Sequence, residues 1–238
     1  MAKEIELSTL RHSTAHVMAE AVLELFPDAQ IAIGPAIENG FYYDFDLPRP
    51  LTDADLETIT KNMRKIINSG REFVRKEVTR EEAKEIFKNQ KYKLELLEAI
   101  PEGETVTTYT QGSFTDLCRG PHVESTKELC ADGFKLLSIA GAYWRGNEKN
   151  KMLTRIYATA WGSKEDLRAY MDHLADIEKR DHRKLGKELD LFSLHEEAGP
   201  GLVYWHPRGA RIRQTIEQFW REEHYKNGYE MVYTPHVG

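Results

Sequence analysis

The residues best suited to chemistry in this 238-residue chain fall into two short groups. His12 and His16 are four positions apart in a segment with helical periodicity, so both imidazoles face the same side of the helix. Cys118 and His122 flank the Gly120-Pro121 dipeptide, which is typical of a turn and would let both side chains face one cavity. Each group alone is a weak signal, because a free cysteine is usually a small buried hydrophobe.

Together the two groups provide three imidazoles and one thiol, and this set suits two chemistries. The four side chains could hold zinc, and a shell of four protein ligands favours a structural ion because catalytic zinc needs an open position. They suit metal-free hydrolysis equally well: a neutral histidine can take a proton from water while Asp116 holds an imidazole in one tautomer. The spacing does not choose between these chemistries.

Apolar periodicity predicts the elements that position these residues. Leu10 to Leu25 has helical spacing, with Ser8 and Thr9 as candidate caps ahead of it and Pro27 behind it. Other signals predict helices over 52–69, after the capping-box pair at 79 and 82, and over 91–100, with strands at 31–35, 40–45, 73–78, 105–110, 134–140 and 152–161. Because helices and strands mix without regular alternation, we expect residues 1–162 to be α+β with antiparallel sheet.

The last third of the chain differs from the rest in its charge content and apolar pattern. Residues 163–189 are highly charged with little apolar surface, which predicts one helix that links two domains. Strands at 202–205 and 230–235 are expected on either side of a helix over 211–225. The apolar face of that helix comprises Ile212, Ile216, Phe219 and Trp220. A piece of this size cannot bury a core by itself, so residues 190–238 are predicted to be an incomplete domain.

Composition sets the broad class. With 40% hydrophobic and 30% charged residues, the chain has an ordinary soluble composition. The net charge of −6 means that an RNA partner would need a local basic patch, and candidates lie at 180–187 and 149–151. Two cysteines do not make a disulfide framework, and no apolar run has the length of a signal peptide or membrane span. A cytoplasmic protein is therefore expected.

The order of these groups resembles the editing domain shared by threonyl- and alanyl-tRNA synthetases. His12-x3-His16 followed by Cys118-x3-His122 is the shared set, and the stretches 92–95, 116–122, 141–146 and 181–186 resemble the threonyl branch. Residues 190–238 resemble the opening of a class II synthetase catalytic domain, whose first motif usually forms part of a dimer interface. The resemblance implies an editing domain over 1–162, a linker helix over 163–189 and an incomplete catalytic domain over 190–238.

The resemblance also assigns roles to individual residues. The implied activity is hydrolysis of mischarged seryl-tRNA(Thr), with tRNA(Thr) as the partner and with no membrane involved, in a parent enzyme that is a homodimeric threonine–tRNA ligase. Tyr92, which lies next to one of the implied site residues, is expected to belong to the hydrophobic core and not to the site. The implied catalytic residues are His12, His16, Lys93, Asp116, Cys118 and His122, and the implied substrate-binding residues are Gly34, Pro35, Tyr43 and Arg119.

Editing is expected to need no cofactor. Zinc at His12, His16, Cys118 and His122 is the disfavoured alternative, because the alanyl relatives hold zinc at this set whereas the threonyl branch is thought to work without a tightly held metal. ATP, magnesium and a separate zinc would belong to the rest of the catalytic domain, and this chain is also expected to lack the small ubiquitin-like domain with which bacterial threonyl enzymes usually begin.

Three other interpretations use the same residues. A free-standing deacylase would act on tRNA charged by another enzyme, although the synthetase-like segment after Asp190 argues against it. A non-catalytic module would bind tRNA or form dimers without cleaving an ester. A structural zinc site would keep the fold and remove the chemistry.

Overall fold

The computed structural model describes residues 5–199 and 201–235. The chain divides into two compact units, Met1–Tyr170 and Met171–Gly238. This division falls inside the segment expected to link two domains, and the finer boundaries at 162 and 189 stay a prediction. None of the helices in the described part is both long and apolar enough to cross a membrane.

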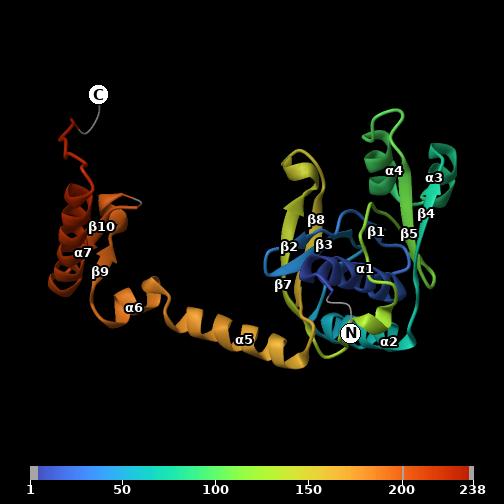
Figure 1. The fold of residues 1–238 in the computed structure, drawn as a ribbon, viewed down its shortest axis with the longest axis horizontal. Helices are drawn as coiled ribbons and strands as arrows, with labels where there is room; N and C mark the ends of the chain where they lie inside the picture. The colour runs from blue at the N-terminus through green and yellow to red at the C-terminus, as the bar shows by residue number, and fades with distance from the viewer. Residues whose placement is uncertain (1–4, 200, 236–238) are drawn as a thin grey trace. The chain divides into compact units, whose positions relative to one another are not determined.

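Two antiparallel sheets form the frame of the first unit (Figure 1). The larger sheet runs in the order β1 (Gln30–Ile31), β3 (Gly40–Asp46), β8 (Met152–Ala160) and β7 (Phe134–Tyr143), with β2 (Ala36–Ile37) also paired to β3. The smaller sheet contains β4 (Phe73–Val78), β5 (Val106–Gln111) and β6 (Phe114–Leu117). The predicted α+β class with antiparallel sheet is confirmed, although β6 was missed because it is short.

Helix α1 (Leu7–Leu25) crosses the middle of this unit, with the larger sheet on one side and the smaller sheet on the other (Figure 1). It packs against β3, β8 and α2 (Asp53–Ser69). Small side chains such as Ala15 and Ala19 are fully buried, which lets the helix lie close to its neighbours. The predicted caps Ser8 and Thr9 were wrong: the helix begins at Leu7 after Glu6, and neither residue caps it.

Helices α3 (Arg80–Ile86) and α4 (Lys91–Glu98) lie beside the smaller sheet (Figure 1). Tyr92 of α4 is buried as predicted, packs edge-on against Trp144 at 5.0 Å between ring centroids, and donates a hydrogen bond to Asp46. Successive side chains on a helix point about 100° apart. Because Tyr92 faces Trp144 and Asp46, the next residue, Lys93, faces a different direction and reaches Asp116 and Tyr43 in the interior of the unit.

The linker prediction was wrong in one respect, because two helices replace the single one. Helix α5 (Lys164–Lys179) ends before Asp181, and α6 (His182–Glu188) begins after it. The Asp181 side chain accepts a hydrogen bond from the Arg183 backbone N–H, so this residue caps a new helix in place of continuing the old one.

The remaining elements of the second unit form a small antiparallel pair and a helix. Strand β9 (Phe192–Leu194) pairs with β10 (Val203–Trp205), and α7 (Pro207–Lys226) follows. The strand expected at 230–235 was wrong, because these residues have no strand partner in the described part of the chain. A strand needs a neighbour for its backbone hydrogen bonds.

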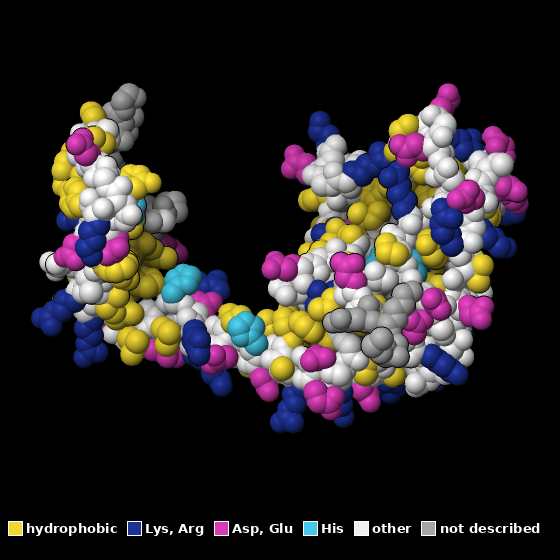
Figure 2. Space-filling view, in the orientation of Figure 1, with side chains coloured by type: hydrophobic (Ala, Val, Ile, Leu, Met, Phe, Trp, Pro, Cys, Tyr) yellow, Lys and Arg dark blue, Asp and Glu magenta, His cyan; other side chains and the backbone are white. Residues whose placement is uncertain are grey.

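This unit leaves much apolar surface uncovered. Figure 2 shows hydrophobic side chains gathered over the segment that contains β9, β10 and α7. The predicted apolar face of α7 is present, and its members are about half exposed or more: Ile212, Ile216, Phe219 and Trp220.

The N-terminus of α2 is stabilised by a side-chain cap. Thr52 accepts a hydrogen bond from the Asp55 backbone N–H and completes a capping box, as its sequence position predicted. Thr52→Ala leaves that donor unpaired and should lower the free energy of unfolding by about 1 kcal/mol. Thr58→Ala is the matched control, since the exposed Thr58 hydroxyl bonds only to the Ala54 carbonyl within the same helix. Equal unfolding free energies for the two variants, measured by urea denaturation, would contradict the capping role.

Candidate active site

Two segments far apart in sequence bring the four predicted residues together. Helix α1 supplies His12 and His16, and the loop after β6 supplies Cys118 and His122. One donor atom from each residue lies within 4.8 Å of the others. His16 is fully buried and the other three are partly buried, so the cluster is closed on one side and reachable on the other.

The thiol of Cys118 lies at the centre of this cluster. Its Sγ is 3.0 Å from His12 Nε2 and 3.3 Å from His122 Nε2. It also accepts a hydrogen bond of 3.2 Å from the Gly120 backbone N–H. The turn predicted from Gly120-Pro121 does bring Cys118 and His122 to face one another.

Each imidazole has an oxygen partner on its other nitrogen. His12 Nδ1 lies 3.3 Å from the Gly34 carbonyl, and His16 Nε2 lies 3.5 Å from Asp116 Oδ2. His122 Nδ1 lies 3.0 Å from Ser13 Oγ. Sequence reasoning missed Ser13, and only its position between the two histidines of α1 could have drawn attention to it.

A buried polar network supports the cluster from the side of β3 and α4. The Tyr43 hydroxyl donates a hydrogen bond of 2.6 Å to Asp116 Oδ2, and Lys93 Nζ donates one of 3.1 Å to the same hydroxyl. Lys93 also forms an ion pair with Asp116 Oδ1. All three side chains are almost fully buried, so each charge is compensated inside the protein.

Gly34 is needed for this arrangement on steric grounds. A Cβ atom at this position would lie 2.0 Å from Cδ2 of the Tyr43 ring. The absence of a side chain thus lets the Gly34 carbonyl approach His12 while Tyr43 stays over Asp116.

Burial keeps the histidines neutral. It is the main cause that lowers the pKa of His12, of His122 and, most completely, of His16. The neighbouring imidazoles lower the pKa of His16 and His122 further. Burial also raises the pKa of the Cys118 thiol to about 12 and that of Tyr43 well above its ordinary value. At neutral pH the cluster therefore contains neutral imidazoles and a protonated thiol.

Two of the predicted substrate-binding residues lie at the edge of the cluster. Pro35 follows Gly34, and its carbonyl accepts a hydrogen bond from the Tyr42 backbone. Arg119 is exposed and pairs with Glu104 at 2.6 Å, so its guanidinium is not drawn into the cluster. It does line, with Cys118, a hollow of about 190 Å³ beside the thiol.

The two predicted basic patches carry acidic partners. Arg183 pairs with Asp181 at 2.6 Å, and Lys151 pairs with Asp46 at 2.8 Å. Each pair weakens the local positive field, so an RNA contact at these patches stays a prediction.

The donor set fits zinc. The Nδ1 atom of His16 is buried without a hydrogen-bond partner, and the other imidazoles point Nε2 at the thiol. Metal-bound histidines characteristically give their second nitrogen to an oxygen, as all three do here. His12, His16, Cys118 and His122 are therefore the residues that would hold such an ion, and four protein ligands would make it structural.

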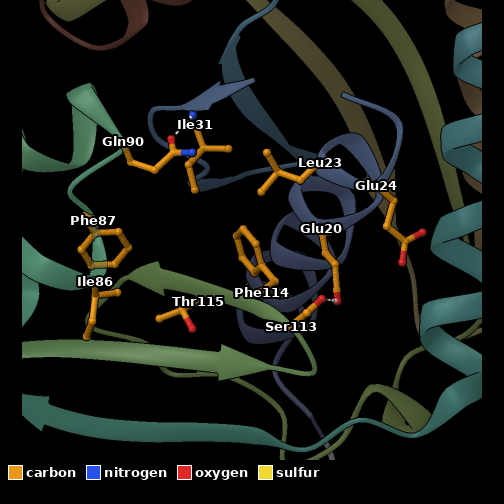
Figure 3. Close-up of a pocket in the computed structure, with 10 residues that line it drawn as sticks. All are labelled: Glu20, Leu23, Glu24, Ile31, Ile86, Phe87, Gln90, Ser113, Phe114 and Thr115. Atoms are coloured by element: carbon orange, nitrogen blue, oxygen red, sulfur yellow. Dashed lines mark hydrogen bonds between the residues drawn. The ribbon is translucent and has the colours of Figure 1, made fainter. Parts of the chain in front are cut away.

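A separate cavity of about 430 Å³ has Phe114 among its lining residues (Figure 3). Phe114 also packs edge-on against His16 at 5.6 Å between ring centroids, but none of the four cluster residues lines the cavity. Glu20 lies in its wall, two turns after His12 and one after His16 on α1, and is paired with Arg71. Because its carboxylate already has partners, Glu20 anchors α1 to the smaller sheet and adds nothing to the cluster.

Comparisons with known proteins find a matching family and several relatives of this chain. Residues 106–157 match the family described as the threonyl and alanyl tRNA synthetase second additional domain. The chain is 56% identical over 236 residues to a threonine–tRNA ligase of Borrelia recurrentis (strain A1), and 55% identical over the same length to one of Borrelia turicatae (strain 91E135). Each match covers 99% of this chain and 40% of the relative, so the chain spans about two fifths of the length of the curated relatives it matches.

The lowered histidine pKa values predict how stability depends on pH. A folded-state pKa below the ordinary value of 6.5 means that the unfolded chain binds more protons at acidic pH. The contribution of the neutral histidines to the free energy of unfolding is therefore complete above about pH 6.5 and is lost as the pH falls. Each histidine that stays neutral contributes a loss of about 1.4 kcal/mol per pH unit below that value.

The variant His122→Gln isolates one such contribution. Between pH 6.5 and pH 5, its unfolding free energy should fall less steeply than that of the parent, by about 1.4 kcal/mol per pH unit. Carboxylate titration is common to both proteins and cancels in the comparison. Parallel stability curves from denaturant titrations would show that His122 is not held neutral.

Proposed function

This chain belongs to the bacterial threonyl-tRNA synthetase family, and from that premise we propose that its first unit hydrolyses the ester of mischarged seryl-tRNA(Thr). One observation carries the proposal: three neutral imidazoles and a thiol converge beside a buried lysine–aspartate–tyrosine network. This set of groups can activate water and stabilise negative charge, which are the two needs of ester hydrolysis.

Water would be activated by a histidine of the cluster. A general base must be unprotonated at the working pH, and burial holds these imidazoles in that state. His12 and His122 are partly exposed, whereas His16 is fully enclosed. We therefore assign proton removal to His12 or His122, and assign to His16 the task of linking the cluster to Asp116.

Lys93 would supply positive charge to the developing oxyanion. Its ammonium group is fixed by Asp116 and by the Tyr43 hydroxyl, so little reorganisation is needed during the reaction. Asp116 would hold Lys93 and His16 in place, and it could also accept a hydrogen bond from the substrate amino group. Tyr43 stays protonated and donates to Asp116.

Cys118 is unsuited to act as the nucleophile. The thiolate is the reactive form, and a pKa of about 12 leaves almost none of it at neutral pH. We propose that Cys118 shapes the pocket and contacts the serine side chain, and that the reaction proceeds by direct attack of water.

The need for this reaction follows from the size difference between two amino acids. Serine lacks one methyl group of threonine, and a binding pocket for threonine gains only about 1–3 kcal/mol of discrimination from such a group. A second site can instead exclude threonine by a steric clash and hydrolyse what fits. Ligation of threonine to tRNA(Thr), and assembly as a homodimer, are proposed for the complete enzyme, since the curated relatives extend well beyond the matched part.

Hydrolysis of charged tRNA tests the proposal directly. The purified chain should release serine from seryl-tRNA(Thr) and leave threonyl-tRNA(Thr) intact. Loss of both esters at equal rates would refute selective editing. Binding of tRNA without loss of either ester would favour a non-catalytic module. If the chain fails to bind tRNA, the same assay is repeated with a serylated minihelix at high concentration.

Replacement of Lys93 tests its assigned role. Lys93→Ala removes the charge at the oxyanion and should lower the hydrolysis rate by about 100–1,000-fold. Lys91→Ala is the matched control, because Lys91 is exposed two residues earlier on the same helix. Thermal denaturation of both variants separates a catalytic loss from unfolding caused by the unpaired Asp116. A folded Lys93→Ala variant with parental activity would exclude this role.

Metal analysis separates hydrolysis by free imidazoles from a structural zinc site. An ion bound by all four residues would occupy the imidazole nitrogens that proton removal requires, so the two states exclude one another. We propose that editing uses the metal-free state. Treatment with a chelator should leave seryl-tRNA(Thr) hydrolysis unchanged, and stoichiometric zinc should inhibit it. Loss of both bound zinc and activity after chelation would contradict the proposal.

A further inference from the structure

The imidazole of His122 is enclosed by four other rings. Phe73 stacks on it at 4.9 Å with planes 10° apart, and His12 stacks at 4.4 Å with planes 18° apart. Tyr109 and His16 approach at 4.5 and 4.1 Å at larger angles. With its faces and edges packed in this way, the ring has one orientation and its two nitrogens have fixed directions.

Each nitrogen of His122 faces one polar partner. Nε2 points at Cys118 Sγ, 3.3 Å away, and Nδ1 points at Ser13 Oγ, 3.0 Å away. Ser13 has no exposed surface, so water does not take part in this contact. The state of the Ser13 hydroxyl therefore decides which nitrogen carries the hydrogen.

The other contacts of Ser13 use its only hydrogen. Oγ donates a hydrogen bond of 2.8 Å to the Thr9 carbonyl, one helical turn earlier, and accepts one of 3.1 Å from the Val123 backbone N–H. A hydroxyl has one hydrogen and two lone pairs. What remains is one lone pair, and it can only accept a hydrogen bond from His122 Nδ1.

We propose that Ser13 is a positioning residue that holds His122 as the Nδ1–H tautomer, with the lone pair of Nε2 directed at Cys118. The Gly34 carbonyl does the same for His12, because a carbonyl only accepts and so Nδ1 of His12 must donate. Both Nε2 lone pairs then point at one thiol.

A single S–H group cannot donate to both nitrogens. While the thiol is bonded to one imidazole, the Nε2 lone pair of the other is free to accept a proton from water. Ser13 thus keeps an unprotonated base available in the cluster at all times. This consequence for the reaction rate rests on the proposed hydrolysis, whereas the tautomer itself does not.

Nitrogen NMR of the complete chain, labelled with ¹⁵N-histidine and freed of metal, tests the tautomer. The spectrum of the parent protein at neutral pH should show His122 protonated at Nδ1 and unprotonated at Nε2, with His122→Gln identifying the signals. In Ser13→Ala the two His122 shifts should move toward one another as the second tautomer becomes populated. The signals of His12 should keep the pattern set by Gly34.

Thr14→Ala is the matched control. Thr14 is also buried on α1 and also donates to the carbonyl one turn earlier, at 2.8 Å, but in the described part of the chain its hydroxyl makes no hydrogen bond to an imidazole. Its spectrum should equal that of the parent at His122. A parent protein with hydrogen on Nε2 of His122 would overturn the proposal even if Ser13→Ala failed to fold. An unchanged tautomer in folded Ser13→Ala would overturn it as well.

The rate of seryl ester hydrolysis provides the second readout. Ser13→Ala should be slower by about 10–100-fold, the usual effect of losing a partner that orients a functional histidine, and Thr14→Ala should match the parent. If the parent protein hydrolyses no ester, the proposed function fails while the tautomer measurement still decides the role of Ser13. Parental activity in a Ser13→Ala variant with an altered His122 tautomer would overturn the proposed effect of the tautomer on the rate of hydrolysis.

Discussion

The first unit depends on the burial of polar groups along α1. This helix carries the buried Ser13, His16 and Glu20 and the partly buried His12 through the centre of that unit, where each unpaired polar atom would cost free energy. The two sheets meet this demand from opposite sides: the loop after β6 and the strand β3 complete the cluster, and Arg71 and Gln111 complete the partners of Glu20. The contacts that pair the polar side chains of α1 are therefore the same contacts that assemble the site.

Local signals in the sequence were sufficient for much of the frame. The end of α1 before Pro27, the bounds of α2 and the capping box of α3 all follow from short-range rules, and the structure confirms them. The linker fails as a single helix because one aspartate can cap a new helix inside a charged segment. Strands β6 and β9 were missed since they have only four and three residues and gain their identity from a partner strand.

The site was accessible to sequence reasoning only in part. Spacing predicts that His12 and His16 share a face, and it predicts a turn between Cys118 and His122. Neither signal states that the pairs meet, which depends on contacts between residues more than a hundred positions apart. Ser13 has no local signature at all, because its role arises from a bond to His122 across the same distance in sequence.

The uncovered apolar face of α7 has a practical consequence for work with this chain. Ile216 and Phe219 are 62% and 64% exposed, on a helix with one buried residue among those described. Patches of this kind promote self-association. We therefore expect this face to limit the solubility of the protein, and salts such as sulfate, which strengthen apolar association, to lower the solubility further.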